Sequence, residues 1–171
     1  MAEAGVFARN RRLELIEGEI IEMSPIGRRH AARVRLLIQL LGQKLVAGEA
    51  ILDVQDPIVL GDHSEPQPDL ALLKPRADFY SEMHPRPEDV FLLIEVADSS
   101  LAYDREAKVP LYARYGVPEV WIADLEGKIV EVLREPTETG YSNVERFSTP
   151  ETLLSPALLP HLGLEVSDLV G

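Results

Sequence analysis

The segment VFLLIEVADSSLAYDREAK, residues 90–108, combines the features that decide the fold. Its first seven residues are apolar except for Glu95, which is the pattern of a β-strand buried on both faces. Two serines then supply N-caps for a helix that runs toward Tyr115, with Gly116 at the expected stop position. A carboxylate inside a buried strand is costly unless it is paired or binds a metal ion. Glu95 is therefore a candidate functional residue.

Two charged residues of the predicted helix lie on its apolar side. At about 100° per residue, Asp104 falls close to the direction of Lys108. The same stripe carries the apolar or aromatic residues Leu101, Leu111, Tyr112 and Tyr115. The alternative is an exposed i,i+4 ion pair, worth only about 0.3–0.5 kcal/mol, which would lie opposite the apolar stripe. Pro110 predicts a kink or a helix in two pieces.

The remaining hydrophobic periodicities predict a mixed β-sheet with two main helices and an N-terminal β-hairpin. The expected elements are a hairpin over 12–23, a helix over 29–46, strands over 50–60, 69–73 and 90–96, a loop over 74–89, and a hairpin formed by 119–125 and 128–135. The chain after Tyr141 is expected to be irregular, with a short helix near its end. The strand–helix–strand unit predicts a parallel crossover within an α/β or α+β fold. The length favours a single domain over 1–171.

Composition and charge limit the possible functions. The chain has 171 residues, 46% of them hydrophobic, with no cysteine and a net charge of −12. The charge argues against a broad basic surface for nucleic acid. No apolar stretch is long enough for a membrane span, and the N-terminal 19 residues lack the apolar core of an export signal, so a cytoplasmic protein is expected. No phosphate-binding glycine-rich motif is present.

A second carboxylate and a histidine join the list of candidate site residues. Asp69 follows Pro68 and opens the strand DLALL. If it converges with Glu95 at one edge of the sheet, the two form a hard oxygen site suited to Mg²⁺ or Mn²⁺. The alternative places Asp69 in solvent and pairs Glu95 with an arginine. His30 lies on the apolar stripe of the first helix, as a core histidine or, near two arginines, as a phosphate contact.

The ordered set of these residues resembles one known family. Pro68-Asp69, IEVADSS at 94–100, Asp104, Lys108 and LYARYGVPEVWIADL at 111–125 are similar to the Uma-two family of endonucleases, and the likeness extends over about 12–135. That family belongs to the PD-(D/E)xK nuclease superfamily. The resemblance implies a restriction-endonuclease-like fold and a metal-dependent DNA endonuclease.

The resemblance also implies roles for individual residues. Asp69 and Glu95 match the two acids of the superfamily motif and would bind Mg²⁺ or Mn²⁺, with the backbone carbonyl of Val96 as a further ligand. The motif expects a lysine two residues after the second acid, where this chain has Ala97. In the family a lysine of the following helix stands in, and Lys108 occupies that place.

Further residues and two alternative functions complete the expectations. His30 and Glu19 resemble family positions near the site, and Asp104 is expected to steer Lys108 or to reach a metal ion through water. The acidic chain favours a homodimer or higher homo-oligomer that joins its grooves around DNA. Ala97 and the net charge of −12 support a catalytically inactive oligomeric or binding scaffold as the alternative. A hydrolase of small phosphorylated compounds is the third hypothesis.

Overall fold

The computed structural model describes residues 12–171. The prediction that no export signal precedes the domain concerns residues 1–19, of which 1–11 lie outside the described part. Those residues also include the first part of the predicted domain, 1–171. In the described part, no helix has the length and apolar character needed to cross a membrane.

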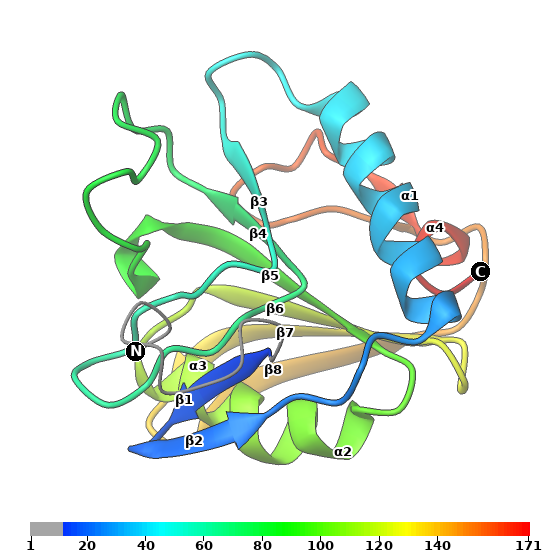
Figure 1. Ribbon diagram of the computed structural model, residues 1–171. Coiled ribbons are helices and arrows are strands. Elements are labelled where there is room, and N and C mark those ends of the chain that lie inside the picture. The colour runs from blue at the N-terminus through cyan, green and yellow to red at the C-terminus, as the bar shows by residue number, and fades with distance from the viewer. Residues whose placement is uncertain (1–11) are drawn as a thin grey trace.

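A six-stranded mixed sheet forms the centre of the molecule, with strand order β3-β4-β5-β6-β7-β8 (Figure 1). Its strands are β3 (Ile51–Val54), β4 (Leu70–Leu73), β5 (Val90–Ala97), β6 (Glu119–Asp124), β7 (Ile129–Thr137) and β8 (Gly140–Phe147). β5 and β6 run parallel, and all other neighbours are antiparallel. The predicted crossover between β5 and β6 and the β6–β7 hairpin are therefore confirmed.

Each face of the sheet is covered by a helical layer. α1 (Arg28–Lys44) packs on one face beside the short C-terminal helix α4 (Val166–Val170). The opposite face carries α2 (Leu101–Tyr103), the π-helical turn η3 (Asp104–Lys108) and α3 (Val109–Arg114). A separate apolar cluster fills each of the two interfaces. The predicted mixed sheet with two main helices is thereby confirmed.

Smaller elements complete the fold. β1 (Leu13–Ile16) and β2 (Glu19–Glu22) form the predicted N-terminal hairpin. The hairpin is joined to the body where the N–H of Glu65 donates to the carbonyl of Leu15 at 2.7 Å. A 3₁₀ turn η2 (Pro87–Asp89) precedes β5, and β9 (Leu153–Leu154) pairs with β10 (Leu164–Glu165) before α4.

The helical segment from Leu101 to Arg114 is interrupted as Pro110 predicts. Proline has no N–H to donate, and its ring clashes with the carbonyl four residues earlier. The chain accommodates it with a π turn, in which the N–H of Val109 donates to the carbonyl of Asp104 five residues before. This turn changes the phase of the helix. Leu111 and Tyr112 of the predicted stripe are buried, whereas Tyr115 follows the last residue of α3 as its C-cap and is 40% exposed.

Two predicted boundaries are wrong. The strand predicted over 50–60 ends at Val54, because Gln55 has a φ of 57° and Pro57 lacks a backbone donor. The tail predicted as irregular after Tyr141 instead continues as β8 to Phe147. β8 is an edge strand with no buried residue, so its sequence lacks the alternation that identifies a half-buried strand. The short helix predicted near the end is confirmed as α4.

Candidate active site

Glu95 is directed toward the α2–α3 side of the sheet by the alternation of strand β5. Side chains of a strand point to opposite faces in turn. Ile94 and Val96 belong to the apolar cluster under α1, whereas Leu93 and Ala97 belong to the cluster under α3. Glu95 shares the latter face, where the helix containing Lys108 packs.

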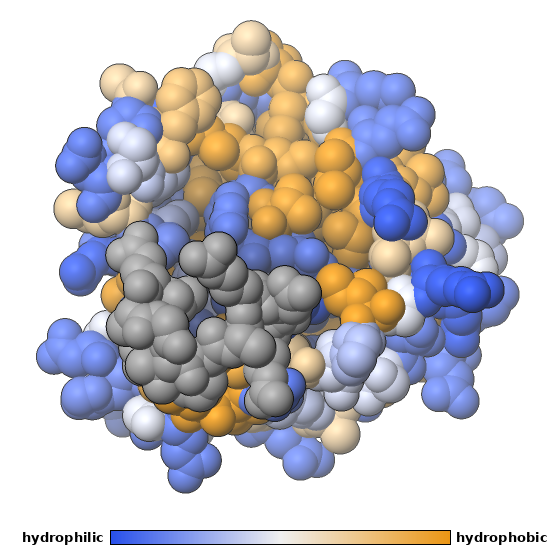
Figure 2. Space-filling view, viewed as in Figure 1, coloured by the Kyte–Doolittle hydropathy of each residue, from blue (hydrophilic) through white to orange (hydrophobic). Residues whose placement is uncertain are grey.

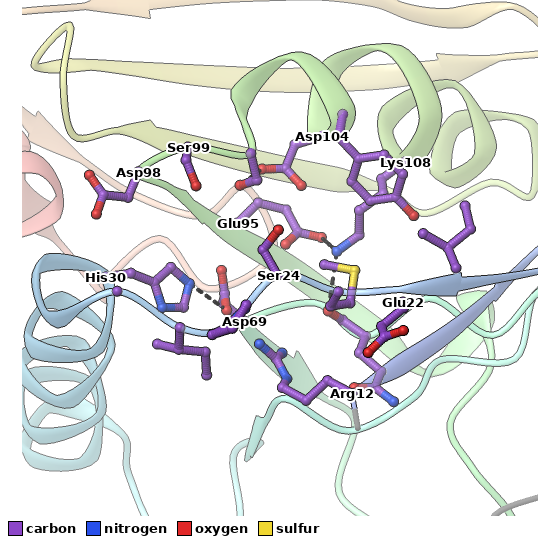
Figure 3. A pocket seen from close by; sticks show the side chains of 18 residues that line it. Arg12, Glu22, Ser24, His30, Asp69, Glu95, Asp98, Ser99, Asp104 and Lys108 are labelled. Carbon is purple, nitrogen blue, oxygen red and sulfur yellow. Dashed lines mark hydrogen bonds and ion pairs between the residues drawn. The ribbon is translucent and has the colours of Figure 1, made fainter. Parts of the chain in front are cut away.

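The predicted site residues surround one cavity of about 320 Å³ (Figure 3). Its lining includes His30, Asp69, Glu95, Asp104 and Lys108, and the link from β2 to α1 contributes residues 23–27. In the face shown in Figure 2, hydrophilic side chains lie in the centre with hydrophobic side chains above them. The fold thus brings together five side chains from four separate segments of the chain.

The Lys108 ammonium is buried and saturated with hydrogen bonds. Its side chain is 1% exposed, and Nζ lies 2.7 Å from Glu95 Oε1, 3.2 Å from Glu14 Oε1 and 3.1 Å from the carbonyl oxygen of Gln67. An ammonium has three donors, so three acceptors use its capacity. Burial opposes the charge, but Glu95, Glu14 and Asp104 together raise the pKa of Lys108 above its ordinary value. Lys108 is therefore a cation and not a base.

Glu95 lies where negative charge exceeds positive charge. It accepts a hydrogen bond from the Tyr112 hydroxyl at 2.6 Å in addition to its contact with Lys108. Burial, with further contributions from Asp104 and Asp69, raises the pKa of Glu95 to about 8 despite the nearby ammonium. One lysine does not neutralise this group of carboxylates, so the cavity favours a proton or another cation.

Asp69 is held by three donors from three different parts of the chain. Its Oδ1 lies 2.9 Å from His30 Nε2 and accepts from Gln55 Nε2 at 3.1 Å. Its Oδ2 accepts from the backbone N–H of Val96 at 2.9 Å, which ties the start of β4 to the end of β5. Burial opposes ionisation, but His30, Val96 and Gln55 lower the pKa of Asp69 below its ordinary value. The carboxylate is therefore ionised.

His30 has one ring nitrogen left for a further contact. Nε2 faces Asp69, while the buried Nδ1 has no hydrogen-bond partner among residues 12–171. If Nε2 donates to Asp69, the Nδ1 of the neutral ring is an acceptor. This arrangement suits a water molecule or a hydroxyl group better than a phosphate oxygen.

Asp104 lines the cavity but does not pair directly with Lys108. Its Oδ2 accepts a hydrogen bond from the Ser100 hydroxyl at 2.6 Å. Within the described part of the chain, the direct ion pairs of Lys108 are with Glu95 and Glu14. Burial raises the pKa of Asp104, and Lys108 partly offsets this effect. Asp104 acts on Lys108 through its charge.

Sequence reasoning missed Glu14, a buried carboxylate of β1. Its Oε1 contacts Lys108 and accepts from the backbone N–H of Gln67 at 2.7 Å, and its Oε2 accepts from the Tyr103 hydroxyl at 3.0 Å. The alternating pattern of the hairpin shows that Glu14 shares a face with Ile16 but not that this face is buried. Glu19, predicted near the site, is exposed and does not line the cavity.

The donor set suits a hard divalent cation that keeps part of its water shell. Among residues 12–171 no group of three or more Asp, Glu or His side chains is placed to hold a metal ion. Mg²⁺, however, is commonly bound through one or two carboxylates, with water and substrate phosphates completing its octahedron. Asp69 and Glu95 line the same cavity, and the excess negative charge around Glu95 favours a cation there.

The raised pKa of Glu95 predicts a specific dependence of stability on pH. The folded state binds more protons than the unfolded state between the ordinary pKa of a glutamate and about 8, so the free energy of unfolding falls as pH rises through this window. Lys108 stays charged throughout it. Across this window the free energy of unfolding is expected to fall by on the order of a few kcal/mol. Glu95→Gln is expected to remove much of this change.

Urea unfolding from pH 5 to 8.5, in EDTA, measures this slope. Glu106→Gln, which neutralises an exposed carboxylate of η3, is the matched control and should keep the wild-type profile. An unchanged slope in Glu95→Gln would show that Glu95 titrates normally and that the cavity carries no excess negative charge.

Comparisons with known proteins give a family match and a shared fold. A family model named Uma2 and described as "Putative restriction endonuclease" matches residues 3–167. Among solved structures, the chain is similar to a "putative nuclease belonging to DUF820" from Anabaena variabilis ATCC 29413, with a TM-score of 0.72 and 22% sequence identity. The likeness covers 92% of this chain and 88% of that chain and shows a shared fold. The comparison with curated proteins gives no significant match.

Proposed function

The chain belongs to the Uma2 family, and from that premise we propose that it is a DNA endonuclease that uses Mg²⁺ or Mn²⁺ to hydrolyse phosphodiester bonds. The observation that carries the proposal is the convergence of Asp69, Glu95 and Lys108 on one cavity. Asp69 and Glu95, with the carbonyl of Val96, would hold the cation. When bound, the cation polarises the scissile phosphate and lowers the pKa of a bound water.

The residues of the chain then have distinct tasks. Hydrolysis forms a bond between the oxygen of water and phosphorus and breaks the bond from phosphorus to a sugar oxygen, which takes up a proton and leaves as an alcohol. Lys108, as a buried cation beside Glu95, stabilises the negative charge that develops on the phosphate. It replaces the lysine that the motif expects at Ala97, because Ala97 and Glu95 lie on the face of β5 against which the helix of Lys108 packs. Asp69 orients His30, whose Nδ1 is an acceptor for a water proton.

Two observations favour a catalytically inactive oligomeric or binding scaffold as the second candidate. Every donor of Lys108 is already used within the protein, and the described residues offer no cage of three ligating side chains. A nuclease must therefore release one contact of Lys108 when substrate binds. A scaffold would keep all three contacts of Lys108. The homodimer or larger homo-oligomer and the cytoplasmic location remain predictions for either candidate.

Nicking of supercoiled plasmid DNA separates the two candidates. The purified protein is incubated with plasmid over a range of Mg²⁺ and Mn²⁺ concentrations, with EDTA as the control. We expect nicked and linear products only with the divalent cation, together with a cation-dependent rise in melting temperature. Neither cleavage nor a shift in melting temperature at any concentration would contradict the nuclease proposal and favour the scaffold.

A further inference from the structure

The segment that contains α1 differs in charge from the rest of the chain. Residues 23–48 hold five of the 17 lysine and arginine residues and none of the 29 aspartate and glutamate residues. The five are Arg28, Arg29, Arg33, Arg35 and Lys44. In a chain with a net charge of −12, an acid-free segment of this length is unusual. The proposed catalytic cavity does not require it, because only Gly27 and His30 from the start of α1 line that cavity.

Part of this charge lines a second hollow of about 390 Å³, which we call the basic groove. It lies between the outer side of α1, the turn from β6 to β7 and the end of α4, segments that lie close together in Figure 1. Its charged lining consists of Arg29, Arg33 and Lys128, and no aspartate or glutamate side chain lines it. The basic groove therefore has the charge that an anionic ligand requires.

Backbone contacts hold two of the three cations in place. Arg29 donates from Nη2 to the carbonyl of Leu125 at 2.9 Å. Arg33 donates from Nη1 to the carbonyl of Asp168 at 2.8 Å, at the C-terminal helix. Both carbonyl groups are neutral, although Asp98 forms an ion pair with Arg29 and the charge of Asp168 acts on Arg33. The groove is thus partly preorganised, which reduces the entropy lost when a ligand binds.

The lining of the basic groove contacts the lining of the proposed catalytic cavity. Arg29 lines the groove, and its Nη1 lies 3.3 Å from Oδ1 of Asp98, which lines the cavity. This ion pair connects a residue of one hollow with a residue of the other. A linear polyanion with a phosphate in the cavity would therefore place neighbouring phosphates at the groove.

We propose that the basic groove binds backbone phosphates of the DNA substrate on one side of the cleavage site. The inference rests on the proposed nuclease function and adds the surface through which an acidic protein would contact its DNA substrate. Lysine and arginine contacts to phosphates release counterions, so they supply affinity without regard to base sequence. The local charge of Arg29, Arg33 and Lys128 offsets the repulsion between DNA and the acidic remainder of the chain.

Removing two groove cations tests the proposal. The variant Arg29→Gln/Lys128→Asn keeps Arg33, whose contacts hold α4, and asparagine tolerates the φ of 52° at position 128. Lys44→Gln/Lys74→Gln removes the same charge from exposed positions that line neither hollow. Binding of a labelled DNA duplex is measured by fluorescence anisotropy in EDTA over a range of salt concentrations, and melting confirms folding.

We expect the groove variant to bind duplex about 10-fold or more weakly, with the slope of log K against log salt reduced by about 2, as two lost phosphate contacts require. The control variant should change affinity less than about 2-fold. Equal losses in both variants, no loss in the groove variant, or no salt-dependent binding by the wild-type protein would each overturn the proposal. The nicking assay tests the nuclease function separately. DNA binding that depends on the groove, without cleavage, would support the proposed role of the groove and contradict the proposed nuclease activity.

Discussion

Replacing Lys108 with methionine is expected to abolish phosphodiester cleavage and to lower the free energy of unfolding by about 3–5 kcal/mol. The change removes the only ammonium in contact with Glu95 and Glu14 within the described residues and leaves both carboxylates buried. Uncompensated buried charges are among the few causes of losses this large. Urea unfolding and the plasmid assay measure the two effects. Lys44→Met, at the exposed end of α1, should stay within about 0.5 kcal/mol of the wild type.

A double variant keeps this test decisive if Lys108→Met does not fold. Lys108→Met/Glu95→Gln removes both partners of the 2.7 Å contact and should recover part of the lost stability. It should remain inactive, because the cation and one proposed metal ligand are both absent. A folded double variant that cleaves DNA at the wild-type rate would show that neither residue takes part in the chemistry.

Asp69→Asn is expected to reduce cleavage by at least about 100-fold while the protein stays folded. The amide keeps the shape of the carboxylate but loses the charge that would hold a divalent cation, whose contribution to the transition state amounts to several kcal/mol. Folding should persist because the neighbours can adapt. The side-chain amide of Gln55 can flip and His30 can change tautomer, so that an acceptor meets the new donor.

Two measurements accompany the activity of Asp69→Asn. Its melting temperature in EDTA should lie close to that of the wild type, whereas the rise in melting temperature with Mn²⁺ should be lost. Gln55→Ala, which removes a hydrogen bond to Asp69 but keeps the carboxylate, is the matched control and should retain the response to Mn²⁺. Undiminished cleavage by a folded Asp69→Asn variant would remove Asp69 from the mechanism.

The sequence was most informative where a charged residue interrupts an apolar pattern. A single carboxylate in the apolar strand β5 and two charges on the apolar stripe of the following helix predicted that Glu95, Asp104 and Lys108 lie inside the protein, and all three are at most 2% exposed. These predictions were confirmed because burying a charge without a partner is costly. A charged residue in an apolar pattern therefore indicates a place where ion-pair or hydrogen-bond partners lie together.

The parts that could not be predicted depend on tertiary contacts. Glu14 belongs to a hairpin whose alternation is compatible with either face inward, and only the docking of β1 on the segment near Glu65 decides the matter. Gln67 contributes a backbone carbonyl, which no side-chain motif reports. β8 was missed because pairing with β7, and not its own residues, makes it a strand.

The π turn between Asp104 and Lys108 limits how homologous sequences can diverge. Loss or gain of one residue there would rotate Lys108 about the helix axis by about 100°, away from Glu95. The loop over 74–89 is free of this restriction, because its length does not set the direction of the ammonium. Over evolutionary time, insertions and deletions should accumulate in that loop and be excluded from the turn, together with changes at Pro110.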